Sequence, residues 1–454
     1  MPDVTPDLAF ADVVVVGAGQ AGLAVAAHLA RSGFRPAGAA GGPTYVVLDA
    51  SPGPGGAWRE RWSGLTMRTV NGVYELPGRP LPTFDADEPA SRALTRYFGD
   101  YERDLALPVR RSVQVRAVRD VAGPERLLAV ETVERPVAEP GPGAPPAPSE
   151  PDAQAATSGA ATRPDFDDGL GGGAGLWRPV TAPVEPQDVR APEQPVAPAV
   201  QDAPARRRSA RTWHARAVVN ATGTWTRPFW PTYPGTQEFA GTQLHTHDYR
   251  AAEDFADRHV LVVGGGISAV QHLLAIHPLA ASTTWVTRRP PDWRDAEFSP
   301  ELGRDAVARV DERTRAGLPP QSIVAATGLP LTEQYRAGIA AGVLVARPMF
   351  ARLVADGAVW DPAAARGPVA DGWVPGPEHV AADVVLWATG FRAALDHLRP
   401  LGLRDAGGGI VMDGTRVVAD PRVQLVGYGP SASTVGANRA GRAAVRQVRR
   451  LLGV

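Results

Sequence analysis

The sequence contains no cysteine and no lysine among its 454 residues. Disulfide reductases and thioredoxin reductases pass electrons through a redox-active pair of cysteines, so enzymes of that type are excluded. The chain has 47 arginines and no lysine. This excludes Schiff-base chemistry through lysine and the lysine of a phosphate-binding P-loop.

The chain also lacks a large net charge and a long apolar run. A formal net charge of −1 and an isoelectric point near 6.8 give no electrostatic reason to expect nucleic acid or an anionic membrane as partner. No window approaches the roughly 18 apolar residues of a spanning helix, and the N-terminus lacks the features of a signal peptide. We therefore expect a cytoplasmic enzyme without a membrane span, folded into about two or three domains.

The most informative feature that is present is a glycine-rich turn after the β-branched run 12–16. Gly17 permits a tight bend, Gly19 lets the backbone approach a pyrophosphate, and Gly22 lets the following helix pack on the strand. The helix begins near Gln20, and its N-terminus offers unpaired N–H groups to an anion. The turn therefore predicts a dinucleotide-binding site.

A second turn of the same kind follows the strand-like run 259–263. It contains Gly264 and Gly266, with Ser268 at the start of the next helical stretch. One such turn can be purely structural. Two turns, each between a strand and a helix, indicate two dinucleotides in one chain, usually a flavin and a nicotinamide.

The residues that end the next strand in each half assign the two ligands. Asp49 follows the strand-like run 44–48, where a carboxylate can bind a ribose hydroxyl, so we expect FAD there. The corresponding run 282–287 ends in Arg288 and Arg289, which suit a 2′-phosphate, so we expect NADPH rather than NADH. The alternative is that these two arginines are ordinary surface residues in a protein rich in arginine.

Composition and motif order predict the domain organisation. We expect an α/β fold with two dinucleotide-binding, Rossmann-like domains. The FAD-binding domain comprises residues 1–250 and 381–454, and it is interrupted by an NADPH-binding domain at 251–380. Residues 135–210 are rich in proline, alanine and glycine and cannot bury enough apolar surface to offset the entropy of ordering. We expect a largely disordered insertion there, with a proline-rich docking segment as the less favoured alternative.

A further pattern lies between the two glycine turns. Phe239, Gly241, His245 and Tyr249 match the spacing F-x-G-x-x-x-H-x-x-x-[YF]. On this pattern the chain resembles class B flavin-dependent monooxygenases. The related Baeyer–Villiger pattern has tryptophan followed by proline or aspartate after the histidine. Here Tyr249 is followed by Arg250, so the resemblance is nearest to the flavin-containing monooxygenase branch.

The resemblance implies NADPH- and O2-dependent monooxygenation of a small molecule that contains nitrogen or sulfur. In this class NADPH reduces FAD, the reduced flavin reacts with O2 to give a C4a-(hydro)peroxide, and NADP+ stays bound beside the flavin. The cofactor carries the chemistry, while the protein supplies positioning and exclusion of water. No metal is required, which agrees with the lack of a convincing cluster of metal ligands in the sequence.

Shorter motifs extend the resemblance to nearly the whole chain outside the proline-rich segment. In the glycine–tryptophan motif, Gly56 and Trp58 are implied contacts of the cofactor, and Trp58 is expected at the flavin edge. Trp62 has the same implied role, with an ordinary core position as an equal alternative. In the second of two Ala-Thr-Gly turns, Thr389 and Gly390 are also implied cofactor contacts.

The resemblance also suggests two residues close to the reaction. His245 is implied to fix the geometry between the domains rather than to act as a general base. Asn71 is implied to touch both the flavin and the nicotinamide, although an ungapped alignment puts Arg68 at that position. Residues 427–430 lack the aspartate that many flavoproteins place on the ribityl chain, and Ser433 precedes a helix whose N-terminus is expected to face the flavin.

Several alternatives to this function stay open. One is Baeyer–Villiger oxygenation of a ketone, which Tyr249 followed by Arg250 disfavours. Another is an NADPH-dependent flavoprotein reductase that passes electrons to a quinone or a partner protein. A third is a flavin-binding sensor without turnover. The expected partners are a small-molecule substrate and O2, and the sequence leaves both the substrate and assembly into a homo-oligomer open.

Overall fold

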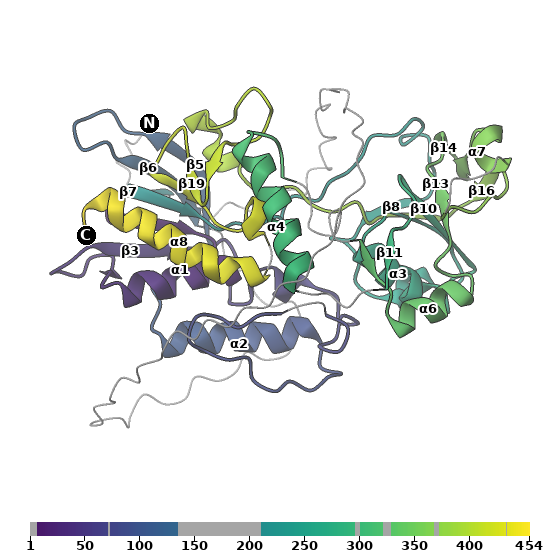
Figure 1. Ribbon diagram of the computed structural model, residues 1–454, viewed down its shortest axis with the longest axis horizontal. Helices are drawn as coiled ribbons and strands as arrows, with labels where there is room; N and C mark the ends of the chain where they lie inside the picture. The colour runs from purple at the N-terminus through teal and green to yellow at the C-terminus, as the bar shows by residue number, and fades with distance from the viewer. Residues whose placement is uncertain are drawn as a thin grey trace, which may run out of the picture. The chain divides into compact units, whose positions relative to one another are not determined.

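The fold is built on two separate sheets of largely parallel strands with helices packed against them (Figure 1). The computed structural model describes residues 7–70, 73–134, 210–295, 300–320, 328–366, 372–432 and 434–454. All of these residues belong to one compact unit. The predicted α/β fold with two Rossmann-like halves is confirmed.

Within the described residues, ten strands form the first sheet, whose main path runs β18-β19-β20-β7-β1-β3-β2. The strands are β1 (Asp7–Val16), β2 (Arg35–Pro36), β3 (Thr44–Leu48), β4 (Val109–Arg110), β5 (Val113–Asp120), β6 (Leu128–Glu134), β7 (Ala210–Asn220), β18 (Met412–Asp413), β19 (Arg416–Val417) and β20 (Val423–Leu425). Strand β1 pairs in parallel with β3 and β7. The run of valines that ends β1 is buried on both faces, as expected for a central parallel strand.

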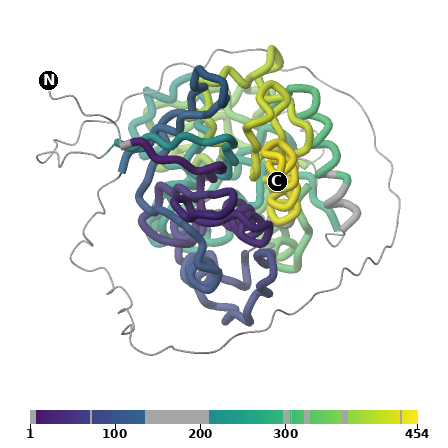
Figure 2. The backbone as a smooth tube through the Cα atoms, turned by 90° about the vertical axis from the view of Figure 1, so that its left-hand side faces the viewer, coloured from purple at the N-terminus to yellow at the C-terminus, as the bar shows by residue number. Residues whose placement is uncertain are grey.

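Helices α1 (Gln20–Arg31) and α8 (Thr434–Leu452) cover one face of the first sheet and lie side by side (Figures 1 and 2). Leu23 and Leu29 of α1 share a buried cluster with Val445 and Val448 of α8. The other helical segments of this half are α2 (Ala90–Asp104), η1 (Gly56–Glu60), η3 (Asp396–Leu401) and η4 (Gly429–Ser431).

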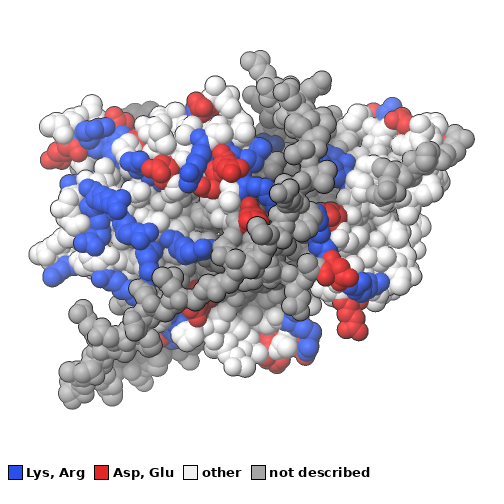
Figure 3. Space-filling model, viewed as in Figure 1, with Lys and Arg blue, Asp and Glu red and all other residues white. Residues whose placement is uncertain are grey.

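The outer face of α8 is basic. Its exposed positions include Arg439, Arg442, Arg446, Arg449 and Arg450, and basic side chains gather over this region in Figure 3. Among the helices that the structure describes, none combines the length and hydrophobicity that crossing a bilayer requires.

The second sheet has the strand order β13-β10-β9-β17-β8, and every pair in it is parallel. Its strands are β8 (Thr242–His245), β9 (His259–Val263), β10 (Ser282–Thr287), β13 (Ala346–Pro348) and β17 (Val384–Trp387). The helical segments of this half are η2 (Ala252–Phe255), α3 (Ile267–Ile276), α6 (Glu333–Ala340) and α7 (Pro362–Arg366). Helix α4 (Pro300–Arg315) lies between β11 and β12 in the sequence but contacts η4 and β18 of the first half. Two small sheets complete it: β11 (Trp293–Arg294) with β12 (Leu329–Pro330), and β14 (Arg352–Val354), β15 (Gly357–Val359) and β16 (His379–Ala381).

Strand pairing extends the second half beyond the predicted boundaries of 251 and 380. Strand β17 lies between β9 and β8 and pairs with both. The strands of the second sheet therefore lie between residue 242 and residue 387. The difference arises because β8 precedes the second glycine turn, within the pattern that contains Gly241 and His245. Strand β17, like β7 of the first sheet, is followed by an Ala-Thr-Gly turn.

The predicted insertion at 135–210 lies outside the described residues except for Ala210. The strands on either side of it are neighbours, since β6 and β7 pair antiparallel and Val133 lies opposite Ala210. The insertion therefore joins two adjacent strands of the first sheet.

Candidate functional site

The first glycine turn joins β1 to α1, and a side chain at two of its glycines would collide with the backbone. Gly17 has a φ of 100°, and a Cβ there would lie 2.7 Å from the carbonyl oxygen of Ala221. A Cβ on Gly22 would lie 1.8 Å from the carbonyl oxygen of Gly17. Gly19 is different, because a Cβ there would meet only the Cα of Gly56, at 4.0 Å. Space is thus left beside Gly19 at the helix N-terminus, and a pyrophosphate fits this cradle.

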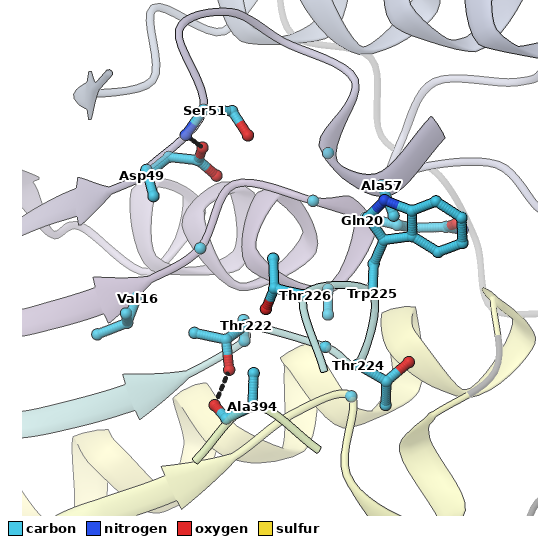
Figure 4. Close-up of a pocket in the computed structure, with 18 of the residues that line it drawn as sticks. Val16, Gln20, Asp49, Ser51, Ala57, Thr222, Thr224, Trp225, Thr226 and Ala394 are labelled. Atoms are coloured by element: carbon cyan, nitrogen blue, oxygen red, sulfur yellow. Dashed lines mark hydrogen bonds between the residues drawn. The ribbon is translucent and has the colours of Figure 1, made fainter. Parts of the chain in front are cut away.

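Asp49 lies at the end of β3, as predicted, and only 6% of it is exposed. Its Oδ2 accepts a hydrogen bond from the backbone N–H of Ala18 at 2.5 Å, and its Oδ1 accepts one from Ser51 at 2.7 Å. Arg111 Nη1 lies 3.4 Å from Oδ1. The carboxylate is therefore held against the glycine turn, where a ribose hydroxyl next to a bound pyrophosphate would reach it (Figure 4).

A cavity of 680 Å³ extends from this turn. It is lined by the β1–α1 turn, the end of β3, η1, part of β5, the turn after β7 and the start of α8. Figure 4 shows Asp49, Thr222 and Trp225 around this space, with Thr222 Oγ1 donating to the carbonyl oxygen of Ala394 at 2.7 Å. A volume of this size is typical of cofactor and ligand sites.

The second glycine turn repeats the arrangement between β9 and α3. Gly264 has a φ of 147°, and a Cβ there would lie 2.2 Å from the carbonyl oxygen of Ala388. A Cβ on Gly266 would meet nothing within 4 Å. Arg288 and Arg289 follow β10 directly and are exposed. The second turn therefore also has the form of a phosphate cradle, with two cations at the neighbouring strand end.

A known protein is similar to the chain over almost its whole length. It is a doubly substituted variant of a flavin monooxygenase from Stenotrophomonas maltophilia. The sequence identity is 30% and the TM-score is 0.65, and the match covers 98% of this chain and 99% of that one. The chain belongs to the flavin monooxygenase family.

Other comparisons cover shorter stretches. A family model described as pyridine nucleotide-disulphide oxidoreductase matches residues 207–327. The ferredoxin–NADP reductase of Rhodopseudomonas palustris is 41% identical over 91 residues, which is 20% of this chain and 26% of that protein. The trimethylamine monooxygenase of Pelagibacter ubique is 38% identical over 72 residues, 16% of each chain. The chain thus matches about a quarter or less of these curated relatives.

The cofactors of this flavin monooxygenase are FAD and NADPH. The residues present fit both groups, because a Cβ built on the middle glycine of either turn would come no closer than 4.0 Å to any residue other than its chain neighbours. Gly17, Gly19 and Asp49 would hold FAD. Gly264 and Gly266 would hold NADPH.

The two tryptophans of the glycine–tryptophan motif have different surroundings. Trp58 lines the cavity. Trp62 is buried in a core cluster, with its ring 5.5 Å from that of Tyr249 and 5.0 Å from that of His272, centroid to centroid. These positions favour a cofactor contact for Trp58 and the core alternative for Trp62. His272 is itself buried, and burial lowers its pKa to about 3.

His245 is completely buried at the end of β8, with both ring nitrogens bonded to the backbone. Nδ1 accepts from the N–H of His247 at 3.0 Å, so Nε2 carries the proton and donates to the carbonyl oxygen of Gly390, also at 3.0 Å. Burial lowers the pKa of His245 to about 4. This neutral, fully bonded ring has the geometry of a positioning residue rather than of a general base.

The remaining predicted residues divide between those the structure places and those outside its described part. Thr389 Oγ1 donates to the carbonyl oxygen of Phe229 at 2.5 Å, and Gly390 is bonded to His245. It is the other Ala-Thr-Gly turn, at 221–223, that lines the cavity. Of the other predicted cofactor contacts, Gln20 and Gly56 line the cavity, and Ser268 lies in the first turn of α3. Asn71 and Ser433 lie outside the described residues, and Arg68 forms an exposed ion pair with Asp87.

Sequence reasoning missed a group of side chains on the cavity wall. Trp225 Nε1 donates to Glu60 Oε2 at 2.7 Å, and the guanidinium carbon of Arg61 lies 3.8 Å from the centroid of the Trp225 ring. Trp225 lies two residues after the first Ala-Thr-Gly turn, and Arg61 lies between the two motif tryptophans. Their places beside known motifs were therefore the available signal.

His397 is another cavity residue that the sequence did not indicate. Its Nε2 lies 2.7 Å from Asn220 Oδ1, and burial lowers its pKa to about 4. No motif surrounds it, because the contact joins η3 to the end of β7, 177 positions away.

Proposed function

We propose that the protein catalyses NADPH- and O2-dependent monooxygenation of a nitrogen or sulfur atom in a small organic molecule. The observation that carries this proposal is the pair of phosphate cradles in a chain without cysteine. Two dinucleotides without a redox-active disulfide leave the flavin itself to pass on the electrons it receives.

The first cradle and its cavity are suited to hold FAD. Backbone N–H groups at the start of α1 bind the pyrophosphate, and Asp49 accepts hydrogen bonds from a ribose hydroxyl. The rest of the 680 Å³ cavity accommodates the remainder of the cofactor. When bound, FAD accepts a hydride from NADPH and, once reduced, reacts with O2.

The second cradle is suited to bind NADPH. Gly266 leaves room for the pyrophosphate, and Arg288 and Arg289 are placed to donate hydrogen bonds to the 2′-phosphate. These guanidinium groups would distinguish NADPH from NADH.

Between the two cradles the chain supplies positioning and exclusion of water. The ring of Phe391 lies 4.8 Å from that of Trp225 and 4.9 Å from that of His245, so an aromatic row connects the cavity wall to the second half. His245 fixes the turn after β17 to the end of β8. A dry, fixed environment of this kind favours oxygen transfer over release of hydrogen peroxide.

The second candidate is an NADPH-dependent reductase that passes electrons to a partner protein. The observation that favours it is the 41% identity to a ferredoxin–NADP reductase over 91 residues. A Baeyer–Villiger reaction on a ketone is a third outcome that the test below distinguishes.

The test is incubation of the FAD-loaded protein with NADPH and 18O2 in the presence of tertiary amines, thioethers or ketones. We expect one atom of 18O in an N-oxide or S-oxide product, in proportion to the NADPH oxidised. An 18O-labelled ester from a ketone would support the Baeyer–Villiger alternative. Rapid reduction of ferricyanide or ferredoxin without any labelled product would contradict the proposal and support the reductase.

A further inference from the structure

Arg61 is a half-buried guanidinium on the wall of the FAD cavity, and the described residues form no salt bridge with it, although the adjacent charge of Glu60 partly offsets its burial. Its Nε is buried, and within the described residues it has no hydrogen-bond partner. The neighbouring carboxylate of Glu60 instead accepts from Trp225 Nε1. Burial lowers the pKa of Arg61 to about 10, so the side chain is nonetheless charged at neutral pH.

Two aromatic rings of the same cavity restrain this guanidinium. Its central carbon lies 3.8 Å from the centroid of the Trp225 ring and 5.7 Å from that of Trp58. Trp225 is in turn fixed by its hydrogen bond to Glu60. A guanidinium packed against an aromatic face keeps its N–H groups free along its edge. Arg61 is therefore oriented before any ligand arrives.

A cation partly removed from water is stable only when an anion or hydrogen-bond acceptors compensate it. The planar fork of N–H donors matches a carboxylate or phosphate with two parallel hydrogen bonds. The proposed function already assigns the FAD pyrophosphate to the first glycine turn and the NADPH pyrophosphate to the second. It assigns the 2′-phosphate of NADPH to Arg288 and Arg289. Arg61 is left without an assigned anion.

We propose that Arg61 binds an oxyanion of a ligand that enters this cavity, either a carboxylate of the substrate or an oxygen of the NADPH pyrophosphate that the second glycine turn leaves free. The inference rests on the proposed function, because that function determines which ligands enter. A carboxylate would make the substrate an anionic molecule whose apolar part packs on Trp58 and Trp225.

The experiment compares FAD-loaded wild type with Arg61→Gln and Arg61→Lys. The matched control is Arg59→Gln: this residue lies on η1, its Nη1 donates to the carbonyl oxygen of Pro54, and it does not line the cavity. The probes are phenylacetate, its neutral counterpart phenylacetamide, and NADP+. Dissociation constants are measured by titration calorimetry without turnover, and FAD content and melting temperature are recorded for every variant.

We expect Arg61→Gln to weaken binding of either phenylacetate or NADP+ by tenfold or more, with phenylacetamide unchanged. Arg61→Lys should lose less, since it keeps the charge but not the fork. Loss for phenylacetate identifies a substrate carboxylate, and loss for NADP+ identifies the pyrophosphate. Arg59→Gln should bind all three probes as the wild type does.

The proposal would be overturned if Arg61→Gln and Arg61→Lys bound phenylacetate and NADP+ as tightly as the wild type does. If wild type does not bind phenylacetate, unchanged affinity for NADP+ alone would overturn it. Equal weakening of phenylacetamide and phenylacetate would also overturn it, and so would loss of FAD as the only effect. Incorporation of 18O tests the proposed function separately, so failure of one leaves the other measurable.

Discussion

The two glycine turns of the chain share a backbone arrangement, but their surroundings differ. The first opens into the 680 Å³ cavity and has an acidic residue, Asp49, buried beside it. The second leaves the space at Gly266 free and is followed by Arg288 and Arg289, both exposed. The turn that we assign to FAD thus lines a cavity and has an acidic neighbour, and the turn that we assign to NADPH is open and basic.

This difference matches the two tasks that a flavin monooxygenase divides between its cofactors. A cofactor that stays bound through many turnovers benefits from a cavity that contacts much of its surface, because each buried contact slows its release. A cosubstrate that must leave after every cycle needs an open site, and exposed arginines select it by charge without enclosing it. The predictions below test this division, from the largest expected effect to the smallest.

The strongest test places the same side chain at the middle glycine of each turn. Gly19→Val and Gly266→Val both lie in extended backbone that valine adopts, and neither Cβ would clash with the protein. Each valine would occupy the space of a pyrophosphate. Gly19→Val should therefore fold but lose FAD, while Gly266→Val should be yellow and fail to bind NADP+. Flavin absorbance and calorimetry measure the two outcomes.

Gly22→Val is the control that separates loss of ligand from loss of fold. Its Cβ would lie 1.8 Å from the carbonyl oxygen of Gly17, so we expect insoluble or unfolded protein. If Gly19→Val retained stoichiometric FAD, the assignment of the first turn would be wrong.

A smaller effect is expected from the cations of the open turn. Arg288→Ala or Arg289→Ala should raise the KM for NADPH about tenfold or more, since a charge-assisted hydrogen bond contributes about 1.5–3 kcal/mol. The KM for NADH should stay nearly constant, because NADH lacks the 2′-phosphate. Equal increases for both cofactors would show that these arginines are ordinary surface residues.

The difference between the two turns could largely be predicted from the sequence, because it depends on residues that are close together in the chain. A tight turn needs Gly17 and Gly264 whatever the rest of the chain does, and the residues that end β3 and β10 are read directly from the sequence. Strand β17 was misplaced because its sheet is decided by partners more than a hundred positions away. The contact of Glu60 with Trp225 joins segments 165 positions apart, and no local pattern encodes it.

His245 lies where the two halves meet, and its replacement tests how they cooperate. His245→Ala removes a buried ring whose two nitrogens are bonded to the backbone, which should lower the free energy of unfolding by about 1–3 kcal/mol. FAD should stay bound, since the first cradle is elsewhere. The ratio of hydrogen peroxide released to NADPH consumed should rise, because the turn after β17 is no longer fixed. His247→Ala, with a partly exposed ring, is the control, and an unchanged ratio in His245→Ala would make His245 purely structural.

The pH dependence of stability compares a buried histidine from each half. Burial lowers the pKa of His397, at the FAD cavity, and of His245, in the second sheet, from 6.5 to about 4. Between these values the unfolded chain binds a proton that the folded chain does not. Stability is therefore lost as the pH falls from about 6.5 towards 4, by about 1.4 kcal/mol per pH unit for each histidine. Melting temperatures of wild type and His397→Gln between pH 7 and 5 should show a shallower decline in the variant. Identical declines would contradict a buried neutral His397.

The smallest effect is expected from deletion of the insertion between β6 and β7, a long segment to which we assign no role. Because Val133 lies opposite Ala210, the two ends are already neighbours, and a short Gly/Ser turn in place of residues 135–209 can connect them. Lengthening a flexible loop costs only about 0.6 kcal/mol per doubling, so shortening it should change stability little. Both turns lie outside the deleted range, and we expect FAD content and NADPH oxidation to match those of the full chain. Loss of FAD alone would mean that the insertion helps to enclose the first turn. Loss of NADPH oxidation alone would mean that it serves the second turn, which would then be less open than its described residues indicate.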